Sequence, residues 1–402
     1  MKNIELFKFY LKHIKSWGIA FLSWFFRHFT TVKEGRVYFE ANGGGKYNCN
    51  PKYLSEYILE HNPNDYEIIW ILTYVADSSE IDKRVKIVHT PSWKVIYYLN
   101  TSEFVITNYR MGYHWTKWRK REYQKYIMTW HGDMIIKKIE LDAANTLPSK
   151  YIESIKKDSR ATDLMLSDSK WFTGLTKRAF NYYGEVLEHG IPRNDIFFSK
   201  EKMETLKKKV FGYYGIEENV KLILYAPTFR DDYGINQYIM DWDEILRSFE
   251  KRFNSKCVVL VRIHPGIKDK IDASVLVKNN NVIDATDYND MQELICALDV
   301  LITDYSSTMF EAALAKKPCF LFVKDAKTYN RGMYFSLDQL PFPYACDIPS
   351  FIQIIDSFDL EKYQKSVKYM FSETFHYVQD GNASKNLVEW MEAHSINNKV
   401  NN

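Results

Sequence analysis

The segment Asp299–Pro318, DVLITDYSSTMFEAALAKKP, decides the fold expected for this chain. The apolar run Val300–Ile302 predicts a buried strand, and a helical pattern begins directly after Ser307. The first backbone N–H groups of a helix have no partner within the helix, and they bind anions. Ligands of open parallel sheets also bind at the carboxyl ends of the strands. The segment therefore predicts either a phosphate site or a capped core helix, because Thr308 and Glu311 fit a capping box.

Short β-rich runs alternate with helical patterns along most of the 402 residues. This alternation predicts parallel sheets built from βαβ units, and the length indicates two domains of similar size. We expect one Rossmann-like domain over residues 34–205 and a second over residues 206–378. Residues 1–33 are expected to form an amphipathic helix. Residues 379–402 are expected to contain a final helix, packed back onto the first domain, and a tail.

The β-rich and helical patterns also give the bounds of individual elements. The expected strands are residues 36–40, 67–72, 85–89, 104–107, 126–130, 164–166 and 185–188 in the first domain, and 222–225, 258–262, 282–284, 300–303 and 319–323 in the second. The expected helices include residues 51–61, 171–182, 200–210, 241–253, 291–298, 307–315 and 385–394.

Composition and cysteine usage narrow the class of protein. The apolar share of 46% and the charged share of 26% are typical of a folded globular protein. The five cysteines are scattered and form no C-x-x-C motif, which argues for reduced thiols in a cytosolic setting and against a zinc site. Residues 43–46 lack the spacing and the Ser/Thr of a nucleotide P-loop. The sequence shows no carboxylate cluster that suggests an obligatory metal, so we expect neither a metal nor a cofactor.

Basic charge is concentrated in two segments that are rich in aromatic residues. Residues 1–33 and 108–125 each carry a balance of +5, whereas the whole chain carries +3. The apolar run over residues 17–26 is too short to span a membrane, which needs about 20 residues. A helix with lysines on one face and aromatic residues on the other suits an anionic membrane surface. The alternative is a helix docked on the protein's own core; no nucleic-acid motif accompanies the patches.

Four motifs stand at the expected carboxyl ends of strands, where a parallel sheet presents its ligands. Together they bring two arginines, two histidines and a hydroxyl-bearing helix start to one cleft. Arginine binds phosphate oxygens bidentately, and histidine can remove a proton from a hydroxyl near neutral pH. A lone histidine is more often a core residue bonded to a backbone carbonyl than a catalytic one, but the combination of motifs indicates a pyrophosphate site. The motifs are Trp130–Gly132, Tyr225–Arg230, Arg262–Pro265 and Asp304–Ser307.

With these motifs the chain resembles the CDP-glycerol glycerophosphotransferase family, of the teichoic-acid primase and polymerase type. The resemblance covers residues 37–390 and implies a GT-B fold, in which an acceptor-side domain and a nucleotide-donor domain face a cleft. It also implies CDP-glycerol as donor, a lipid-linked glycan as acceptor, and a peripheral position on the cytoplasmic face of the bacterial membrane. Further matching residues are Gly44, Tyr47, Asn50, Pro51, Ser167–Ser169, Gly190–Asp195, Phe310, Glu311, Lys317, Pro318, Asp380 and Gly381.

The resemblance implies a role for residues of every motif. His131 is implied as the base that takes the acceptor's proton, and His264, with Arg230, as a catalytic residue at the donor's phosphates. Glu311 is implied as a partner of the donor's ribose. The other implied donor-binding residues are Pro227, Thr228, Arg262, Thr303, Asp304, Ser306 and Ser307, and the implied acceptor-side residues are Gly44, Tyr47, Asn50, Asp133 and Lys137.

One loop departs from the family pattern. After His-Gly the family often continues with Thr-Pro-Leu-Lys, whereas this chain has DMIIK over Asp133–Lys137. The acceptor therefore stays open between a teichoic acid, a capsule and another surface glycan, and the transferred group between glycerol phosphate and ribitol phosphate. The alternatives are a GT-B glycosyltransferase that uses a nucleotide sugar and a non-catalytic glycan-binding protein. Because the sequence carries no additional amino-terminal module, we expect limited addition rather than polymerisation.

Overall fold

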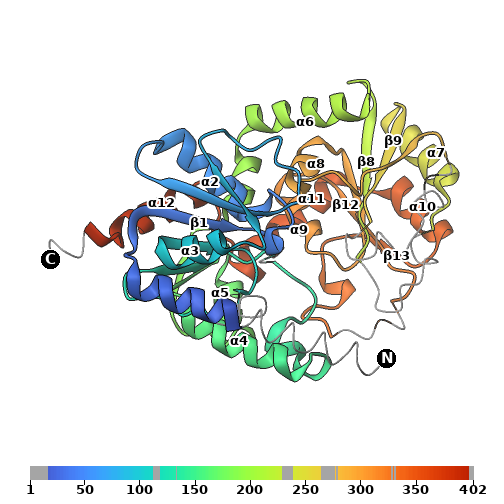
Figure 1. Cartoon of the computed structure of the whole chain (residues 1–402). Helices are drawn as coiled ribbons and strands as arrows, with labels where there is room; N and C mark the ends of the chain where they lie inside the picture. The colour runs from blue at the N-terminus through green and yellow to red at the C-terminus, as the bar shows by residue number, and fades with distance from the viewer. Residues whose placement is uncertain are drawn as a thin grey trace, which may run out of the picture.

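The computed structural model describes residues 17–111, 118–132, 134–228, 239–263, 277, 279–326, 329 and 332–397. Two α/β domains lie beside each other, the first mostly blue and green and the second mostly yellow and orange in Figure 1. Each domain is built around one parallel sheet, as the alternation of β-rich and helical patterns predicts.

The first domain contains a seven-stranded sheet in the order β3-β2-β1-β4-β5-β6-β7. The chain runs outward from β1 to β3 and then returns to the other side of β1 with β4, which is the doubly wound pattern. The central strands are buried over most of their length, because helices cover both faces of a parallel sheet. The strands are β1 (Lys33–Glu40), β2 (Glu67–Thr73), β3 (Lys86–Thr90), β4 (Ser102–Thr107), β5 (Lys125–Met128), β6 (Leu164–Ser167) and β7 (Glu185–Glu188).

The second domain repeats this arrangement with a six-stranded parallel sheet in the order β10-β9-β8-β11-β12-β13. Its strand order reverses between β8 and β11, and such a switch point is where doubly wound sheets bind ligands. The strands are β8 (Lys221–Tyr225), β9 (Cys257–Val261), β10 (Val282–Asp284), β11 (Val300–Thr303), β12 (Cys319–Phe322) and β13 (Tyr344–Ala345).

Helices connect the strands and cover the sheets. The helix nearest the amino terminus covers residues 17–29. The others are α2 (Cys49–His61), α3 (Trp93–Thr101), α4 (Ser149–Ala161), α5 (Lys170–Ala179), α6 (Lys200–Tyr214), α7 (Trp242–Phe253), α8 (Met291–Ala297), α9 (Thr308–Leu314), α10 (Ile348–Ser357), α11 (Leu360–Tyr369) and α12 (Ala383–Ala393), with shorter turns η1 (Asn42–Gly44), η3 (Glu140–Thr146), η4 (Pro192–Phe198), η7 (Leu337–Gln339) and η8 (Met370–Phe375).

The chain passes between the domains more than once. α6 enters the second domain, where its Val210 and Phe211 join the core around β8 and β11. α12, red in Figure 1, then lies against the first domain, where Leu387 and Met391 pack in the same core as Trp70 of β2. The last helix of the sequence therefore completes the core of the first domain.

A buried ion-pair cluster ties α2 of the first domain to α8 of the second. Lys52 Nζ lies 2.8 Å from Asp290 Oδ2 and 2.8 Å from Glu293 Oε1, and all three side chains are buried. Beside this cluster, the Asn289 side chain donates a hydrogen bond to the backbone oxygen of Tyr47, at 3.0 Å. Opposite charges of the two domains thus meet in a buried cluster.

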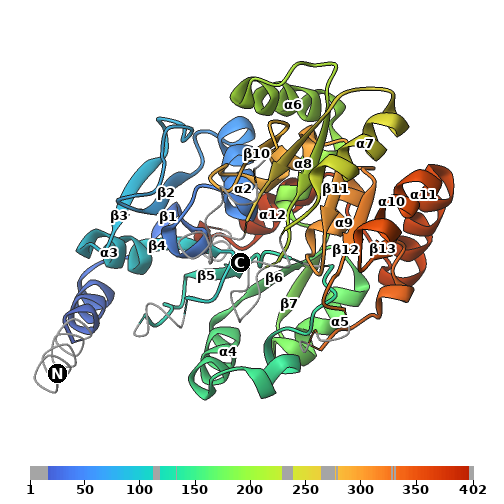
Figure 2. The ribbon, with the colours of Figure 1, turned by 90° about the vertical axis from the view of Figure 1, so that its right-hand side faces the viewer.

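The helix over residues 17–29 is attached to the body by one side only. Its Phe26 is buried and packs against the rings of Trp93 and Tyr97 at α3. Figure 2 shows this helix, in dark blue, projecting from the molecule below α3. Its other aromatic side chains are exposed, including Trp17 at 71% and Phe21 at 61%. Among the described residues, no helix combines the length and the apolar character that crossing a membrane requires.

Candidate functional site

His131 stands on a strained turn directly after β5. Trp130 has a positive φ of 53°, which is uncommon for a residue with a bulky side chain and is typical of functional sites. Asn50 of α2 holds this turn, because its side-chain amide donates to the backbone oxygens of Thr129 (3.1 Å) and Trp130 (3.0 Å). The turn is therefore fixed by a residue from another part of the first domain.

The hydrogen bonding of His131 determines its tautomer. Its Nδ1 lies 2.8 Å from the backbone oxygen of Asn108, which follows β4. A carbonyl oxygen can only accept, so Nδ1 carries the proton and Nε2 of the neutral ring carries the lone pair. Part of the His131 ring is open to solvent. The surrounding protein atoms nevertheless disfavour its charged form, and the positive charges of Arg193 and Arg110 add to this effect. The pKa of His131 is therefore lowered to about 4. The imidazole is thus a neutral base at pH 7.

On the facing domain, the ends of β8 and β11 are fastened to each other. The Thr228 backbone N–H and hydroxyl donate to the two carboxylate oxygens of Asp304, at 2.9 Å and 3.1 Å. The Thr303 hydroxyl donates to the backbone oxygen of Ala226 at 2.7 Å. Asp304 and Pro227 are buried, so these residues shape the loops at the switch point rather than form its surface.

Ser306 and Ser307 are half-buried and lead into α9. The expected capping box of Thr308 and Glu311 is wrong. The residue that precedes the helix is Ser307, its side chain makes no capping hydrogen bond, and Ser306 Oγ instead accepts the Thr308 N–H at 3.3 Å. Glu311 is drawn away from the helix start because its Oε1 lies 2.5 Å from Arg193 Nη2 of the first domain. α9 has only seven residues. For binding an anion, the serine hydroxyls and the N–H groups of the loop are therefore expected to contribute more than the dipole of this short helix.

The two half-sites meet at Gly132 and Ser307. A Cβ atom placed on Gly132 would lie 3.2 Å from Ser307 Oγ, so the turn of His131 is in direct contact with the loop before α9. The segment after this turn also pairs with the second domain. The Tyr334 N–H donates to the backbone oxygen of Ile136 at 2.7 Å. The backbone of half-buried Lys137 forms an isolated antiparallel β-bridge with Met333. The contact brings the implied base beside the implied phosphate loop.

Three residues expected on the acceptor side instead support the site from within. Tyr47 is buried, with its ring centroid 4.5 Å from that of Trp70, and Asn50 is wholly buried beneath the His131 turn. Gly44 has a φ of 77°, and a Cβ there would lie 3.4 Å from the Ile71 oxygen. These residues shape the loop after β1 and the turn after β5, and they do not form an acceptor surface.

Of the remaining candidates from the sequence, one lies among the described residues and three do not. Arg262 is buried at the end of β9, with Nη1 3.7 Å from Met291 Sδ, and burial lowers the pKa of its guanidinium. Arg230, His264 and Asp133 lie outside the described residues. Two residues at the site were not named as candidates. Asn108 follows a strand end, which could have identified it, whereas Arg193 stands in the matching segment Gly190–Asp195 without a role that the sequence reveals.

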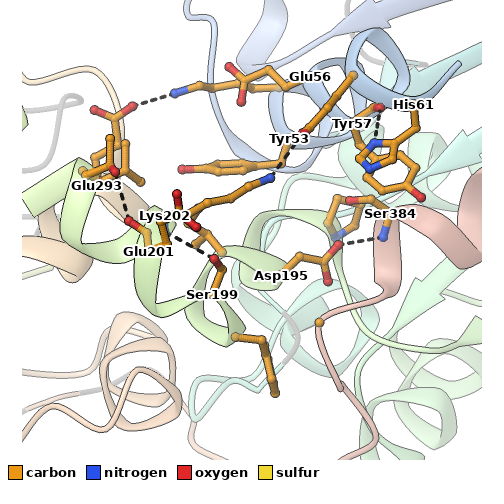
Figure 3. Close-up of a pocket in the computed structure, with 18 of the residues that line it drawn as sticks. Tyr53, Glu56, Tyr57, His61, Asp195, Ser199, Glu201, Lys202, Glu293 and Ser384 are labelled. Carbon is orange, nitrogen blue, oxygen red and sulfur yellow. Dashed lines mark hydrogen bonds and ion pairs between the residues drawn. The ribbon is translucent and has the colours of Figure 1, made fainter. Parts of the chain in front are cut away.

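A larger cavity, of about 930 Å³, lies elsewhere (Figure 3). It is bounded by α2, η4, α6 and the start of α12, and no described residue of the four strand-end motifs lines it. Seven carboxylates and three lysines line this cavity, including Glu56, Glu201 and Lys202 in Figure 3. An excess of carboxylates is unsuited to a pyrophosphate, so this cavity does not replace the strand-end motifs as the candidate phosphate site.

Known proteins resemble the chain along nearly its whole length. The model of the CDP-glycerol:poly(glycerophosphate) glycerophosphotransferase family matches residues 22–393. The teichoic acid poly(glycerol phosphate) polymerase of Bacillus subtilis strain 168 is 29% identical over 370 residues, which are 89% of this chain and 48% of that protein. The chain thus spans about half the length of that relative. The teichoic acid glycerol-phosphate transferase of Staphylococcus aureus strain NCTC 8325 is 29% identical over 369 residues, 88% of this chain and 92% of that protein.

Solved structures give the same picture. A variant of the wall teichoic acid polymerase TagF has a TM-score of 0.81 and 25% identity, covering 99% of both chains. A TagF variant soaked with CDPG has a TM-score of 0.79 and 26% identity, covering 97% of both chains. Together with the two doubly wound sheets, this similarity confirms the expected GT-B fold.

Proposed function

The chain belongs to the CDP-glycerol:poly(glycerophosphate) glycerophosphotransferase family, as its motifs predict. On this premise we propose that it transfers glycerol phosphate from CDP-glycerol to a hydroxyl group of a lipid-linked cell-surface glycan, in teichoic acid or capsule synthesis. The products are CMP and a glycan extended through a phosphodiester. The glycerol-phosphate transferase and polymerase among the relatives support glycerol phosphate as the transferred group.

The single observation that carries this proposal is the neutral His131 beside Ser307. Nε2 takes the proton of the acceptor hydroxyl while the hydroxyl oxygen attacks the phosphorus that bears glycerol. The bond from that phosphorus to the bridging oxygen breaks, and CMP leaves with the electron pair. Donor groups fixed beside the leaving phosphate stabilise the charge that develops there. We assign the Ser306 and Ser307 hydroxyls to this role because they lie beside the turn of His131, and we assign Arg230, Arg262 and His264 to it by family resemblance.

The proposed reaction needs no metal ion, because arginine and histidine side chains supply positive charge around the phosphates and hydroxyl groups donate hydrogen bonds to them. We expect excess EDTA to leave the rate of CMP release within about twofold of the untreated rate, measured by chromatography with the full chain. A loss of activity in EDTA that Mg²⁺ or Mn²⁺ restores contradicts this part of the proposal.

We also propose that the chain works at the cytoplasmic face of the membrane, as a peripheral protein. The exposed aromatic side of the helix over residues 17–29 supports this position, since Trp and Phe partition into the headgroup region. Arg27 of this helix donates to the backbone oxygen of Arg119 at 2.7 Å, so the two basic segments lie next to each other. Such a joined basic and aromatic surface attracts anionic lipid headgroups.

The test supplies the full chain with CDP-glycerol, CDP-ribitol or a UDP-sugar, each with candidate lipid-linked acceptors. CMP release and product mass are followed by chromatography and mass spectrometry. We expect CMP release with CDP-glycerol and a product heavier by one or more glycerol phosphate units. If the protein releases CMP only with CDP-ribitol, the transferred group is ribitol phosphate and not glycerol phosphate. Transfer from the UDP-sugar alone overturns the proposal in favour of a glycosyltransferase.

A further inference from the structure

Arg193 connects the two halves of the site through its side chain. It lies in η4 of the first domain, and its guanidinium is buried with only 8% exposure. Nη2 lies 2.5 Å from Glu311 Oε1 of α9, in the second domain, and Nη1 lies 3.1 Å from Cys49 Sγ at the start of α2. A buried pair of this kind crosses the domain interface directly behind the loop of Ser307.

The backbone of Arg193 makes a second connection, to the turn of His131. Its N–H donates to Asn50 Oδ1 at 3.2 Å. The amide of the same Asn50 donates to the backbone oxygens of Thr129 and Trp130. One side chain thus joins η4 to the turn that carries the base, and the ion pair with Glu311 joins η4 to α9.

A small polar cavity lies between these connections. Its lining includes Gly132, Asp168, Asn194 and Ser307, together with Arg193 and Glu311, and its volume of about 10 Å³ is that of a single water site. Asp168 Oδ1 and Asn194 Oδ1 are buried in this region without a protein hydrogen-bond partner. Burial raises the pKa of the Asp168 carboxyl to about 7. The first domain therefore places two unsatisfied polar groups beside the contact of Gly132 with Ser307.

Buried ion pairs contribute little net stability, because desolvation offsets their attraction, but they can fix one arrangement of packed elements. We propose that Arg193 is a positioning residue that holds the turn of His131 in register with the Ser306–Ser307 loop across the domain interface. This inference rests on the proposed function only for its kinetic consequences.

The charge of Arg193 gives the inference a second, independent consequence. Arg193 and Arg110 both disfavour the imidazolium form of His131. The charge of Arg110 is opposed by two buried carboxylates, with Glu140 at 2.6 Å and Asp158 at 3.4 Å. Arg193 faces Glu311 across the interface, and Asp168 lies in the same cavity; the neighbouring Asp133 is outside the described residues. Loss of the Arg193 charge should therefore raise the pKa of His131.

The kinetic test compares Arg193→Gln, Glu311→Gln and the double variant in the full chain. We expect each single variant to lower kcat for CMP release by about 10- to 100-fold, since a 1 Å misplacement of reacting groups can cost about 100-fold. KM for CDP-glycerol should change less than threefold. The double variant should be no slower than the slower single one, because both remove the same connection. The inference is overturned if the kcat losses of the two single variants multiply in the double variant. It is also overturned if kcat is unchanged in both single variants.

The second readout needs no substrate. Titration of the His131 ring by NMR, assigned with His131→Ala among the 10 histidines, gives its pKa in each variant. We expect a higher value in Arg193→Gln and no rise in Glu311→Gln, where the guanidinium remains. Arg193→Lys should restore the low value without restoring kcat, because an ammonium keeps the charge but not the forked contacts. The same value in wild type and Arg193→Gln contradicts the placement of Arg193 beside His131.

Two controls separate the possible failures. Arg84→Gln removes an exposed arginine that is paired with Asp82 at 2.8 Å, and it should change neither kcat nor the His131 titration. If circular dichroism shows that Arg193→Gln does not fold, Arg193→Lys takes its place. Glu311→Gln and the double variant Arg193→Lys/Glu311→Gln then test the connection. If wild type turns over no CDP-glycerol, the proposed function fails, while the titration still decides the positioning of Arg193.

Discussion

His131 can act as a base because the backbone oxygen of Asn108 accepts its Nδ1 proton. The sequence shows a histidine between a tryptophan and a glycine after a strand, which indicates a site but not a tautomer. The carbonyl that fixes the tautomer belongs to the neighbouring strand end, and the strained φ of Trp130 aims the ring. The turn of Trp130 is also held by Asn50, which the resemblance places at the site but which acts from beneath it.

Replacement of His131 tests its role directly. We expect His131→Ala to lower kcat for CMP release by at least about 100-fold, the low end of the contribution of general-base catalysis. Binding of CDP-glycerol, measured by calorimetry, should change little because the base contacts the acceptor. His61→Ala is the matched control, since His61 also bonds a backbone oxygen through Nδ1, at 3.0 Å, but lies on α2 away from the cleft. Wild-type activity in His131→Ala contradicts the assignment.

The pH dependence follows from the same ring. The protein atoms around His131 lower its pKa to about 4, and the ring must be neutral to accept a proton. Activity should therefore be retained as the pH falls from 8 to about 5 and be lost as it falls through about 4. An ordinary histidine, with a pKa of about 6.5, would give the loss about 2.5 pH units higher. The measurement is kcat/KM against pH, with folding checked at each pH; half-loss between pH 6 and 7 contradicts this expectation.

Among the elements, the strands are the best predicted. β7, β10 and β11 have the expected bounds, because each apolar run is short and ends in polar residues. Helices α10 and α11 are not among the expected elements. Each buries two residues one turn apart, such as Phe351 and Ile355 in α10, and so narrow an apolar stripe gives a weak signal. α9 is shorter than expected because its chain turns at Ala315 and Lys316 into β12.

The helix over residues 17–29 provides a test at this scale. We expect the double variant Phe21→Ser/Trp24→Ser to bind vesicles of phosphatidylglycerol and phosphatidylcholine at least about 10-fold more weakly, because two exposed aromatic rings no longer enter the interface. Binding by both proteins should weaken with added salt. Tyr369→Ser, an equally exposed aromatic in the second domain at 67%, should bind as wild type. Unchanged binding of the double variant in a co-sedimentation assay contradicts the proposed membrane surface.

In the whole molecule, the two domains are joined by contacts between residues far apart in the sequence. Lys52 pairs with Asp290 and Glu293, and Arg193 pairs with Glu311. The segment after His131 pairs with residues 332–334 of the second domain. The relative placement of the half-sites therefore depends on buried polar contacts as well as on apolar packing.

The Lys52 cluster yields a prediction for the stability of this arrangement. We expect Lys52→Met to lower the free energy of unfolding by up to about 3–5 kcal/mol, because Asp290 and Glu293 stay buried without the lysine. Lys209 also pairs with Glu293 at 2.8 Å and should reduce the loss. Lys202→Met removes an exposed pair with Glu60 and should cost no more than about 1 kcal/mol. Urea unfolding followed by fluorescence measures both, and equal midpoints for the two variants contradict the prediction.

The sequence by itself determined the class of the chain: parallel sheets and the family to which it belongs, with a predicted phosphate site at the end of β11. These features are local, since strand runs and strand-end motifs are written in consecutive residues. The tertiary structure decided what those motifs do to one another. It gave His131 its tautomer through Asn108 and turned Glu311 from a helix cap into a partner of Arg193. Such pairings depend on the packing of two domains, which no local pattern encodes.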